Sequence, residues 1–122
     1  DEQLAFAGKS GTSQVRNISA AERARGVISN DDLPWERRDH ALFVGYGPYA
    51  DPKVAVAVVV EHGGGGSSVA GPIVRDILLR CLTGGMPPLS AYPSAQRGRM
   101  ETLLNGLQLR HTEPEVTAKS RA

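Results

Sequence analysis

The sequence has few cysteines, no long apolar segment and no signal-peptide pattern. It holds one cysteine in 122 residues, so no internal disulfide is possible. Cys81 falls on an apolar pattern with helical spacing, which predicts a buried structural thiol. The longest apolar run, Val54–Val60, is too short to span a bilayer, and the first ten residues lack the apolar core of a signal peptide. The chain also lacks a starting methionine, so we expect it to be a fragment, and these absences do not indicate where the parent protein resides.

The charge balance also lacks a strong excess of either sign. Fourteen basic and 13 acidic residues leave a net charge of +1, and the second half of the chain is only slightly more basic than the first. A bias this weak argues against nucleic acid as a partner. The length fits one domain or part of one, and we find no internal repeat.

Hydrophobic patterning predicts an α+β chain with three strands and one long helix. The expected strands are Leu4–Val15, His40–Tyr46 and Lys53–Glu61. The turn at 47–52 is rich in breakers, so the last two strands should form an antiparallel hairpin. The third strand is apolar throughout, which predicts burial on both faces. On the first strand, a period of two places Phe6, Ser10 and Thr12 on one face.

The helices carry recognisable end signals. Ser19 and Glu22 form a capping-box pattern that opens a short helix ending near Gly26. Ser67 or Ser68 is expected to cap the long helix, which should run to about Leu82 before Gly84-Gly85 ends it. Pro72 fits only in its first turn. Its expected apolar stripe is Val69, Ile73, Val74, Ile77, Leu78 and Cys81.

The remaining segments carry weaker patterns. Residues 94–106 could form a short helix with Met100, Leu103 and Leu104 on one side, whereas His111–Ala122 resembles a disordered tail. Trp35 lies in a polar loop, where an aromatic side chain is more often an anchor onto the core than a ligand platform.

The glycine run at 63–66 lies between a strand and a helix, where phosphate can bind. A Walker loop needs a lysine at its end, and the dinucleotide pattern needs a glycine where Ser68 stands, so we interpret the run as a flexible connector. His62 beside Glu61 has no second ligand at helical spacing, which argues against a metal site. His40 and His111 are expected to be structural or on the surface. No cofactor is expected.

The segment Lys9-Ser10-Gly11-Thr12 is the one that indicates a function. It resembles the Lys-Ser/Thr-Gly signature of active-site serine transpeptidases and β-lactamases, which works beside a Ser-x-x-Lys and a Ser-x-Asn. Neither partner motif occurs in this chain. The residues three before the lysines are Phe6, Ala50 and Val116, and those two before the asparagines are Val15, Ile28 and Leu103. We therefore expect one wall of an active site without its nucleophile.

The context of this motif resembles class B penicillin-binding proteins. Phe6–Val15 is similar to their Ala-Gly-Lys-Thr-Gly-Thr-Ala/Ser-Gln segment, with Ser10 in place of the usual threonine. His40–Tyr49 is similar to their next strand, which usually ends Phe-Val-Gly-Phe/Tyr-Ala-Pro, and this argues against a β-lactamase. Val54–Glu61 and Ala70–Ile73 resemble the last strand and the start of the C-terminal helix. The resemblance covers roughly residues 3–82 and is strongest to the elongation transpeptidases.

The resemblance implies a partial β-lactamase/transpeptidase-like fold. Residues 1–85 would be the C-terminal part of the transpeptidase domain and residues 86–122 an extension, partly disordered or a short helix. Of the five antiparallel strands of the family, the last three would be present, with the Lys-Ser-Gly strand at an edge. Val54–Glu61 would lie in the interior, so we expect its outer edge to pair with another segment or another chain.

In this family a serine attacks the penultimate D-alanine carbonyl of a peptidoglycan stem peptide, and the acyl group then passes to an amine; β-lactams acylate the same serine. The resemblance implies that Lys9 supplies positive charge across the cleft and that the hydroxyls of Ser10 and Thr12 bind the substrate carboxylate. The Thr12 backbone N–H would form half of the oxyanion hole, and Gly11 would leave room for the acyl group. Without the serine, the isolated chain should be inactive.

The resemblance also implies partners and a location. The ligands would be stem peptides and β-lactams, and the protein partners would be the preceding part of the same protein and the cell-elongation machinery, including a polytopic glycan polymerase. The location would be the periplasmic face of the inner membrane, anchored by a segment outside this chain. The alternative is a non-enzymatic binding module, in which Lys9-Ser10-Gly11 is incidental and need not lie along an exposed sheet edge.

Overall fold

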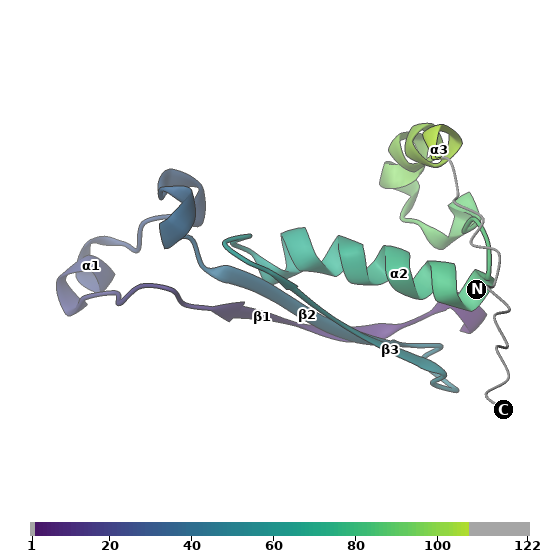
Figure 1. Cartoon of the computed structure of the whole chain (residues 1–122), viewed down its shortest axis with the longest axis horizontal. Helices are drawn as coiled ribbons and strands as arrows, with labels where there is room; N and C mark the ends of the chain where they lie inside the picture. Colours follow the sequence, from purple (N-terminus) through teal and green to yellow (C-terminus); the bar gives the residue numbers. More distant parts are fainter. Residues whose placement is uncertain (1, 108–122) are drawn as a thin grey trace, which may run out of the picture.

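The computed structural model describes residues 2–107 and confirms the α+β class. Three strands form one antiparallel sheet in the order β1-β2-β3. They are β1 (Ala7–Ser13), β2 (His40–Gly47) and β3 (Val54–Val60), and the helices are α1 (Ala20–Arg25), α2 (Gly71–Thr83) and α3 (Arg97–Gly106). Helix α2 runs along one face of the sheet, α1 lies beyond one end of it and α3 lies at the other end (Figure 1). None of the helices within residues 2–107 has the length and apolar character needed to span a bilayer.

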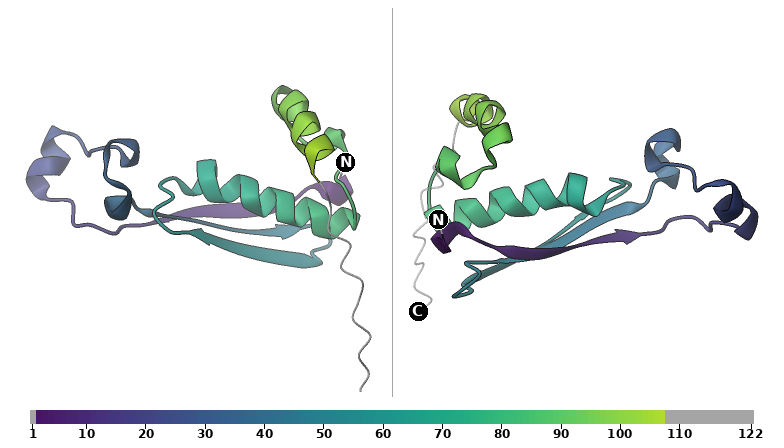
Figure 2. Two further views of the ribbon diagram at one scale, coloured as in Figure 1. Left: turned by 45° about the horizontal axis from the view of Figure 1, so that its top comes forward. Right: turned by 180° about the vertical axis from the view of Figure 1, so that it is seen from behind.

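The two faces of the sheet have different surroundings. On the face towards α2, Ala41 and Gly45 are buried, and a Cβ built on Gly45 would lie 2.9 Å from Val74 Cγ1. On the opposite face, Val44 and Tyr46 are exposed. Figure 2 shows that no described element covers this second face. We refer to the two sides as the helix face and the open face.

Helix α2 stabilises the sheet through fully buried apolar side chains. Val74 and Leu78 are inaccessible to solvent. Leu79 is buried in a second cluster with Tyr92 and with Met100, which belongs to α3. Pro72 lies in the first turn and Gly84 ends the helix in the left-handed conformation, as predicted. The predicted serine cap is wrong, because a π-helical turn at Gly66–Ala70 precedes α2 and Ala70 occupies the cap position without a side-chain hydrogen bond.

Cys81 is exposed, so the prediction of a buried thiol is also wrong. The predicted stripe is wider than the surface that the sheet covers. Ile73 and Ile77, on the same stripe, are likewise exposed, whereas Leu79, outside it, is buried against the C-terminal cluster. Helix α2 therefore packs on two sides, against the sheet and against the segment that follows it.

Strand β3 differs most from its sequence prediction. Its residues alternate between half-buried and exposed, and Val59 on the open face is 62% exposed. The prediction of burial on both faces is thus wrong within this chain, because no described element lies on the open face. β3 is also an edge strand, since no segment within 2–107 pairs with its outer side. Pairing with a second chain stays a prediction.

The other elements follow their local signals with small shifts. β1 is shorter than predicted, because Glu2–Leu4 forms a 3₁₀ turn and the strand ends at Ser13. Residues 94–106 form a 3₁₀ turn followed by α3, as expected, although Leu103 is exposed. Trp35 is 57% exposed and does not anchor the core; its ring lies against that of His62, with 4.4 Å between centroids. The tail predicted to be disordered lies outside the described residues.

Candidate functional site

The segment Lys9–Thr12 lies in β1, at one edge of the sheet. β1 pairs with β2 on one side, and within the described residues nothing pairs with its other side. Lys9 and Thr12 are exposed, while Ser10 and Gly11 are half-buried. The exposed sheet edge that the transpeptidase interpretation requires is therefore present, with Lys9 and Thr12 accessible along it.

The side chains of this segment divide between the two faces. Lys9 is opposite Val44, which places it on the open face, whereas Thr12 is opposite Ala41, on the helix face. Ser10 shares the face of Thr12, as the period of two predicted. The Lys9 side chain returns to the strand edge, because its Nζ donates a hydrogen bond to the Ser10 carbonyl oxygen over 2.8 Å. An ammonium group and two hydroxyls thus flank the same stretch of backbone.

The register shows which backbone groups of β1 point away from the sheet. In an antiparallel pair, residues that exchange two hydrogen bonds alternate with residues that exchange none. A Cβ built on Gly66 would meet the carbonyl oxygens of Gly11 and Leu42 and lie 3.1 Å from the Gly11 nitrogen. These three atoms can converge there only if all of them lie between the two strands, so Gly11 and Leu42 form a hydrogen-bonded pair.

It follows that Ser10 and Thr12 direct their backbone groups outward from the free edge. The bond from Lys9 Nζ to the Ser10 carbonyl agrees with this, since that oxygen is accessible at the edge. Within residues 2–107, the Thr12 N–H is thus a donor without a partner, pointing out of the sheet beside a lysine. Such a donor can stabilise a negative charge that develops on a bound carbonyl oxygen.

The two glycines of β1 have different surroundings. A Cβ on Gly8 would collide with the Phe43 ring and lie 2.7 Å from the Val44 carbonyl oxygen, so only glycine fits there. A Cβ on Gly11 would meet only Leu42 Cβ, at 3.5 Å, which is an ordinary contact. The packing of this chain therefore explains why position 8 is a glycine but does not require a glycine at position 11. The predicted role of Gly11 beside an acyl group stays a prediction.

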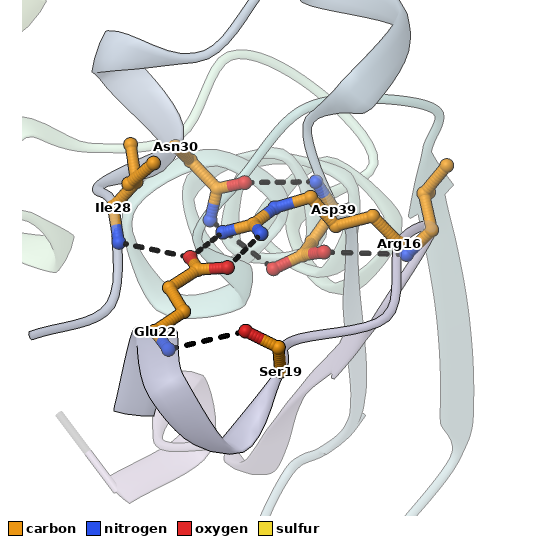
Figure 3. Close-up of polar contacts among 7 residues, drawn as sticks. Arg16, Ser19, Glu22, Ile28, Asn30 and Asp39 are labelled. Carbon is orange, nitrogen blue, oxygen red and sulfur yellow. Dashed lines mark hydrogen bonds and ion pairs between the residues drawn. The ribbon is translucent and has the colours of Figure 1, made fainter. Parts of the chain in front are cut away.

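The segment after β1 is held to the start of β2 by Asp39 (Figure 3). The Val15 N–H donates to Asp39 Oδ1 over 3.3 Å. Asn30 binds Asp39 twice, since it accepts from the Asp39 N–H at Oδ1 over 2.8 Å and donates from Nδ2 to Oδ2 over 3.3 Å. The exit of the site strand is therefore fixed by side chains. The sequence analysis did not predict these hydrogen bonds of Asp39, because no local motif joins residues 15, 30 and 39.

Glu22 is the centre of a second group of contacts in the same region (Figure 3). Its carboxylate accepts two hydrogen bonds from the Arg16 guanidinium, at 2.7 and 2.6 Å, and a third from the Ile28 N–H at 3.3 Å. These bonds hold the pKa of Glu22 below its ordinary value, with the Arg16 bond as the main cause. Ser19 caps α1 by accepting from the Glu22 N–H over 3.1 Å, as predicted. Only the serine half of the predicted capping box thus forms, because the carboxylate of Glu22 binds Arg16 and Ile28 in place of the Ser19 N–H.

The two histidines lie at the end of the sheet where β1 ends, since His40 is opposite Ser13, and they bind each other. The His62 backbone N–H donates to His40 Nδ1 over 2.8 Å, so that ring nitrogen carries no proton. His62 Nδ1 lies 3.0 Å from the Arg38 carbonyl oxygen, which can only accept. Residues 2–107 contain no group of three histidine, cysteine or acidic side chains that could hold a metal. The contacts give both histidines a structural role, joining the ends of β2 and β3.

The open face beside Lys9 carries a shallow apolar hollow of about 500 Å³. Its lining includes Ala7, Lys9, Val44, Tyr46, Ala55 and Ala57. Val44, one of the lining residues, is 52% exposed. An apolar surface of this kind, next to an exposed lysine, is typical of a face that another part of a protein covers.

The comparisons with known proteins agree with this geometry. The family of the penicillin-binding protein transpeptidase domain matches residues 1–79, and the chain therefore belongs to this family. The chain is 38% identical over 92 residues to the peptidoglycan D,D-transpeptidase MrdA of Haemophilus influenzae, covering 75% of this chain and 14% of that protein. To the MrdA of Acinetobacter baumannii it is 41% identical over 78 residues, covering 61% of this chain and 11% of that protein.

A solved structure is also similar, the complex between penicillin-binding protein PBP2 and MreC from Helicobacter pylori. The TM-score is 0.46 and the sequence identity 32%, covering 65% of this chain and 12% of the matched chain. The resemblance to class B penicillin-binding proteins, found from the sequence, is confirmed by the family match and the MrdA relatives. The chain spans only a small part of each of these proteins.

Proposed function

We propose that this chain forms the substrate-carboxylate and oxyanion wall of a peptidoglycan D,D-transpeptidase. The observation that carries the proposal is the free edge of β1, where an outward Thr12 N–H lies beside Lys9. The relatives named D,D-transpeptidase support the reaction class. The catalytic serine is supplied from outside this chain, because the sequence holds no Ser-x-x-Lys.

Each residue of the segment has a task in this reaction. The serine attacks the penultimate D-alanine carbonyl of a stem peptide, or the ring of a β-lactam, and negative charge develops on the carbonyl oxygen. The Thr12 N–H donates a hydrogen bond to that oxygen, and one such donor typically contributes about 10²–10³ in rate. The hydroxyls of Ser10 and Thr12 bind the terminal carboxylate, and the Lys9 ammonium attracts it. Gly11 leaves space for the acyl group.

The uncovered open face supports the proposal that the serine-bearing part binds on that side of the sheet. Lys9 projects on this face, and the apolar side chains around it are uncovered in the described residues. Covering them with the preceding part of the same protein removes apolar surface from water and brings the serine next to Lys9. The outer edge of β3 is available for strand pairing with the same part.

The proposal extends to partners and location. The substrates are peptidoglycan stem peptides and the inhibitors are β-lactams. The enzyme acts with the cell-elongation machinery, including a polytopic glycan polymerase, and contributes to cell shape. It works at the periplasmic face of the inner membrane, held there by an N-terminal segment outside this chain. Residues 1–85 belong to the transpeptidase domain and residues 86–122 form its C-terminal extension.

A fluorescent penicillin tests the reaction class directly. We expect the full-length protein that contains this chain to form a covalent adduct, and the 122-residue chain alone to form none. A covalent adduct on the isolated chain would contradict the proposal, and so would a folded full-length protein that stays unlabelled.

Two substitutions at Thr12 separate its N–H from its hydroxyl. Thr12→Val keeps the N–H and removes the hydroxyl, whereas Thr12→Pro removes both. Proline is tolerated at an edge position whose N–H faces outward, because no sheet hydrogen bond is lost. In the full-length protein we expect Thr12→Pro to slow acylation by about 10²–10³ beyond Thr12→Val. Equal acylation rates, in variants of equal thermal stability, would exclude Thr12 as the donor.

The alternative function, a non-enzymatic binding module, is less well supported. It requires the Lys9 segment to be incidental, yet that segment lies exposed at a free edge within a match to a transpeptidase family. The penicillin experiment distinguishes the two, because a binding module forms no adduct in any context.

A further inference from the structure

The back of the site strand is in direct contact with a glycine from the run 63–66. Gly66 is buried, and it lies on the helix face over the hydrogen-bonded pair of Gly11 and Leu42. A Cβ on Gly66 would collide with the Gly11 carbonyl oxygen and lie 2.5 Å from the Leu42 carbonyl oxygen. Both obstacles are backbone atoms of the sheet, so no side chain can turn away to relieve the contact. A larger residue at 66 must displace either the loop or the strand.

The peptide group under Gly66 is the one that carries the outward donor. The Gly11 carbonyl and the Thr12 N–H belong to one planar trans peptide, and they point in opposite directions. The carbonyl points inward to β2, where Gly66 lies against it, and the N–H points outward from the free edge. Any displacement of the Gly11 carbonyl therefore tilts or shifts the Thr12 N–H.

The loop that holds Gly66 is fastened on both sides. Before it, the Gly64 N–H donates to the Asp39 carbonyl oxygen over 2.8 Å. After it, the Gly71 N–H donates to the Gly66 carbonyl oxygen at the start of α2. Gly64 has a φ of +81°, which favours glycine. The run is thus a fixed support, and the prediction of a flexible connector is wrong for the described structure.

We infer that Gly66 is a positioning residue for the oxyanion donor. It supports the Gly11–Thr12 peptide from behind, and its missing side chain keeps the Thr12 N–H directed at the reacting carbonyl. The inference rests on the proposed function, because the donor has a task only in acyl transfer. Misplacing a catalytic group by about 1 Å can cost about 10² in rate.

The test compares two alanine substitutions in the full-length protein. Gly66→Ala places a methyl group against the β1 backbone. Gly65→Ala is the matched control, because its Cβ would meet only the Ser68 side chain, whose Oγ lies 2.5 Å away and can rotate. Gly65 has a φ of −86°, which alanine adopts without strain. Each variant adds one methyl group, at neighbouring positions of the same loop, so the two differ only in what that methyl group contacts.

The assay is the acylation kinetics of a fluorescent penicillin, resolved into the constant for non-covalent binding and the rate constant for acylation. The substrate carboxylate contacts determine the first and the oxyanion donor determines the second. We expect Gly66→Ala to lower the acylation rate constant about 10²-fold with little change in binding. Gly65→Ala should match the wild type in both constants. The affinity of an acylamido boronic acid, which mimics the tetrahedral intermediate, should fall with the acylation rate constant.

Other results overturn the inference. If Gly66→Ala acylates like Gly65→Ala, the contact does not position the donor. If binding and acylation fall together with the melting temperature, the glycine is needed only for folding. If the wild type itself forms no adduct, the proposed function fails first, so the two failures are distinguishable.

If Gly66→Ala does not fold, a crystal structure of the acylated wild-type protein tests whether Gly66 supports the oxyanion donor. We expect the acyl oxygen within about 2.7–3.1 Å of the Thr12 nitrogen, with Gly66 still against the Gly11 carbonyl. An acyl oxygen bound to Thr12 with Gly66 displaced from Gly11 would refute the inference.

Discussion

The contact between β2 and α2 at Gly45 predicts a compensating pair of mutations. A Cβ on Gly45 would lie 2.9 Å from Val74 Cγ1 and 3.3 Å from Leu78 Cδ1. Both distances are shorter than the optimum of about 3.5–4.0 Å between carbon atoms. Val74 and Leu78 are fully buried, so neither can move into solvent. We expect Gly45→Ala to cost about 1–3 kcal/mol, as overpacking of a core typically does.

Val74→Ala makes the opposite change at the same place. It removes two buried methyl groups, each worth about 0.8 kcal/mol on transfer, and leaves a cavity that adds to the cost. In the double variant the new methyl group at position 45 enters the space that Cγ1 vacates. We therefore expect the double variant to be more stable than the sum of the single effects by about 1–2 kcal/mol, a typical coupling for contacting residues.

The free energies of unfolding come from urea denaturation followed by far-ultraviolet circular dichroism. Trp35, the only tryptophan, gives an independent fluorescence signal from the loop between β1 and β2. Coincident transitions from the two probes would justify a two-state treatment. Ile73→Ala, on the exposed side of α2, is a control that should not couple to Gly45→Ala. If Gly45→Ala and Val74→Ala add within about 0.5 kcal/mol, the packing described for this interface is refuted.

Three further predictions concern the loop after β1 and helix α2. The pKa of Glu22 lies below its ordinary value, so the ionised carboxylate contributes to stability at neutral pH. This contribution is lost as the pH falls through the lowered pKa. Glu22→Gln should therefore remove this part of the acid dependence of the melting temperature. Asp39→Ala should speed amide hydrogen exchange at Val15 more than Asp39→Asn, which keeps an acceptor; equal rates would contradict the hydrogen bond. Cys81 should react with a thiol reagent in the native protein as fast as in urea, whereas protection would indicate burial.

Local signals in the sequence were sufficient for some of the element ends, although not for the start of α2 or the bounds of β1. The Ser19 cap, Pro72 in the first turn and the left-handed Gly84 each depend on residues within a few positions of one another. The motif Lys9–Thr12 was also found at the predicted strand and edge, because its residue types and order are specific. These features depend on neighbours in the chain, and short-range patterning is enough to recognise them.

The missed features all depend on packing between distant segments. Cys81 is exposed, whereas Leu79 is buried by the segment that follows α2, and the helical period alone cannot indicate where that segment packs. Asp39 joins two segments that are 24 and nine residues away in the sequence. Gly66 matters because it touches Gly11, 55 positions earlier, and a glycine run carries no information about what lies behind it.

The two faces of β1 have different neighbours in this chain. On the helix face, Gly66 packs against the Gly11–Thr12 peptide, and the chain itself provides this support. On the open face, Lys9 adjoins an apolar hollow that the described residues leave uncovered. Under the proposed function, the contact with Gly66 orients the Thr12 N–H before substrate binds, because both belong to the supported stretch of β1 backbone. The uncovered open face then remains for the segment that we propose to bring the nucleophile.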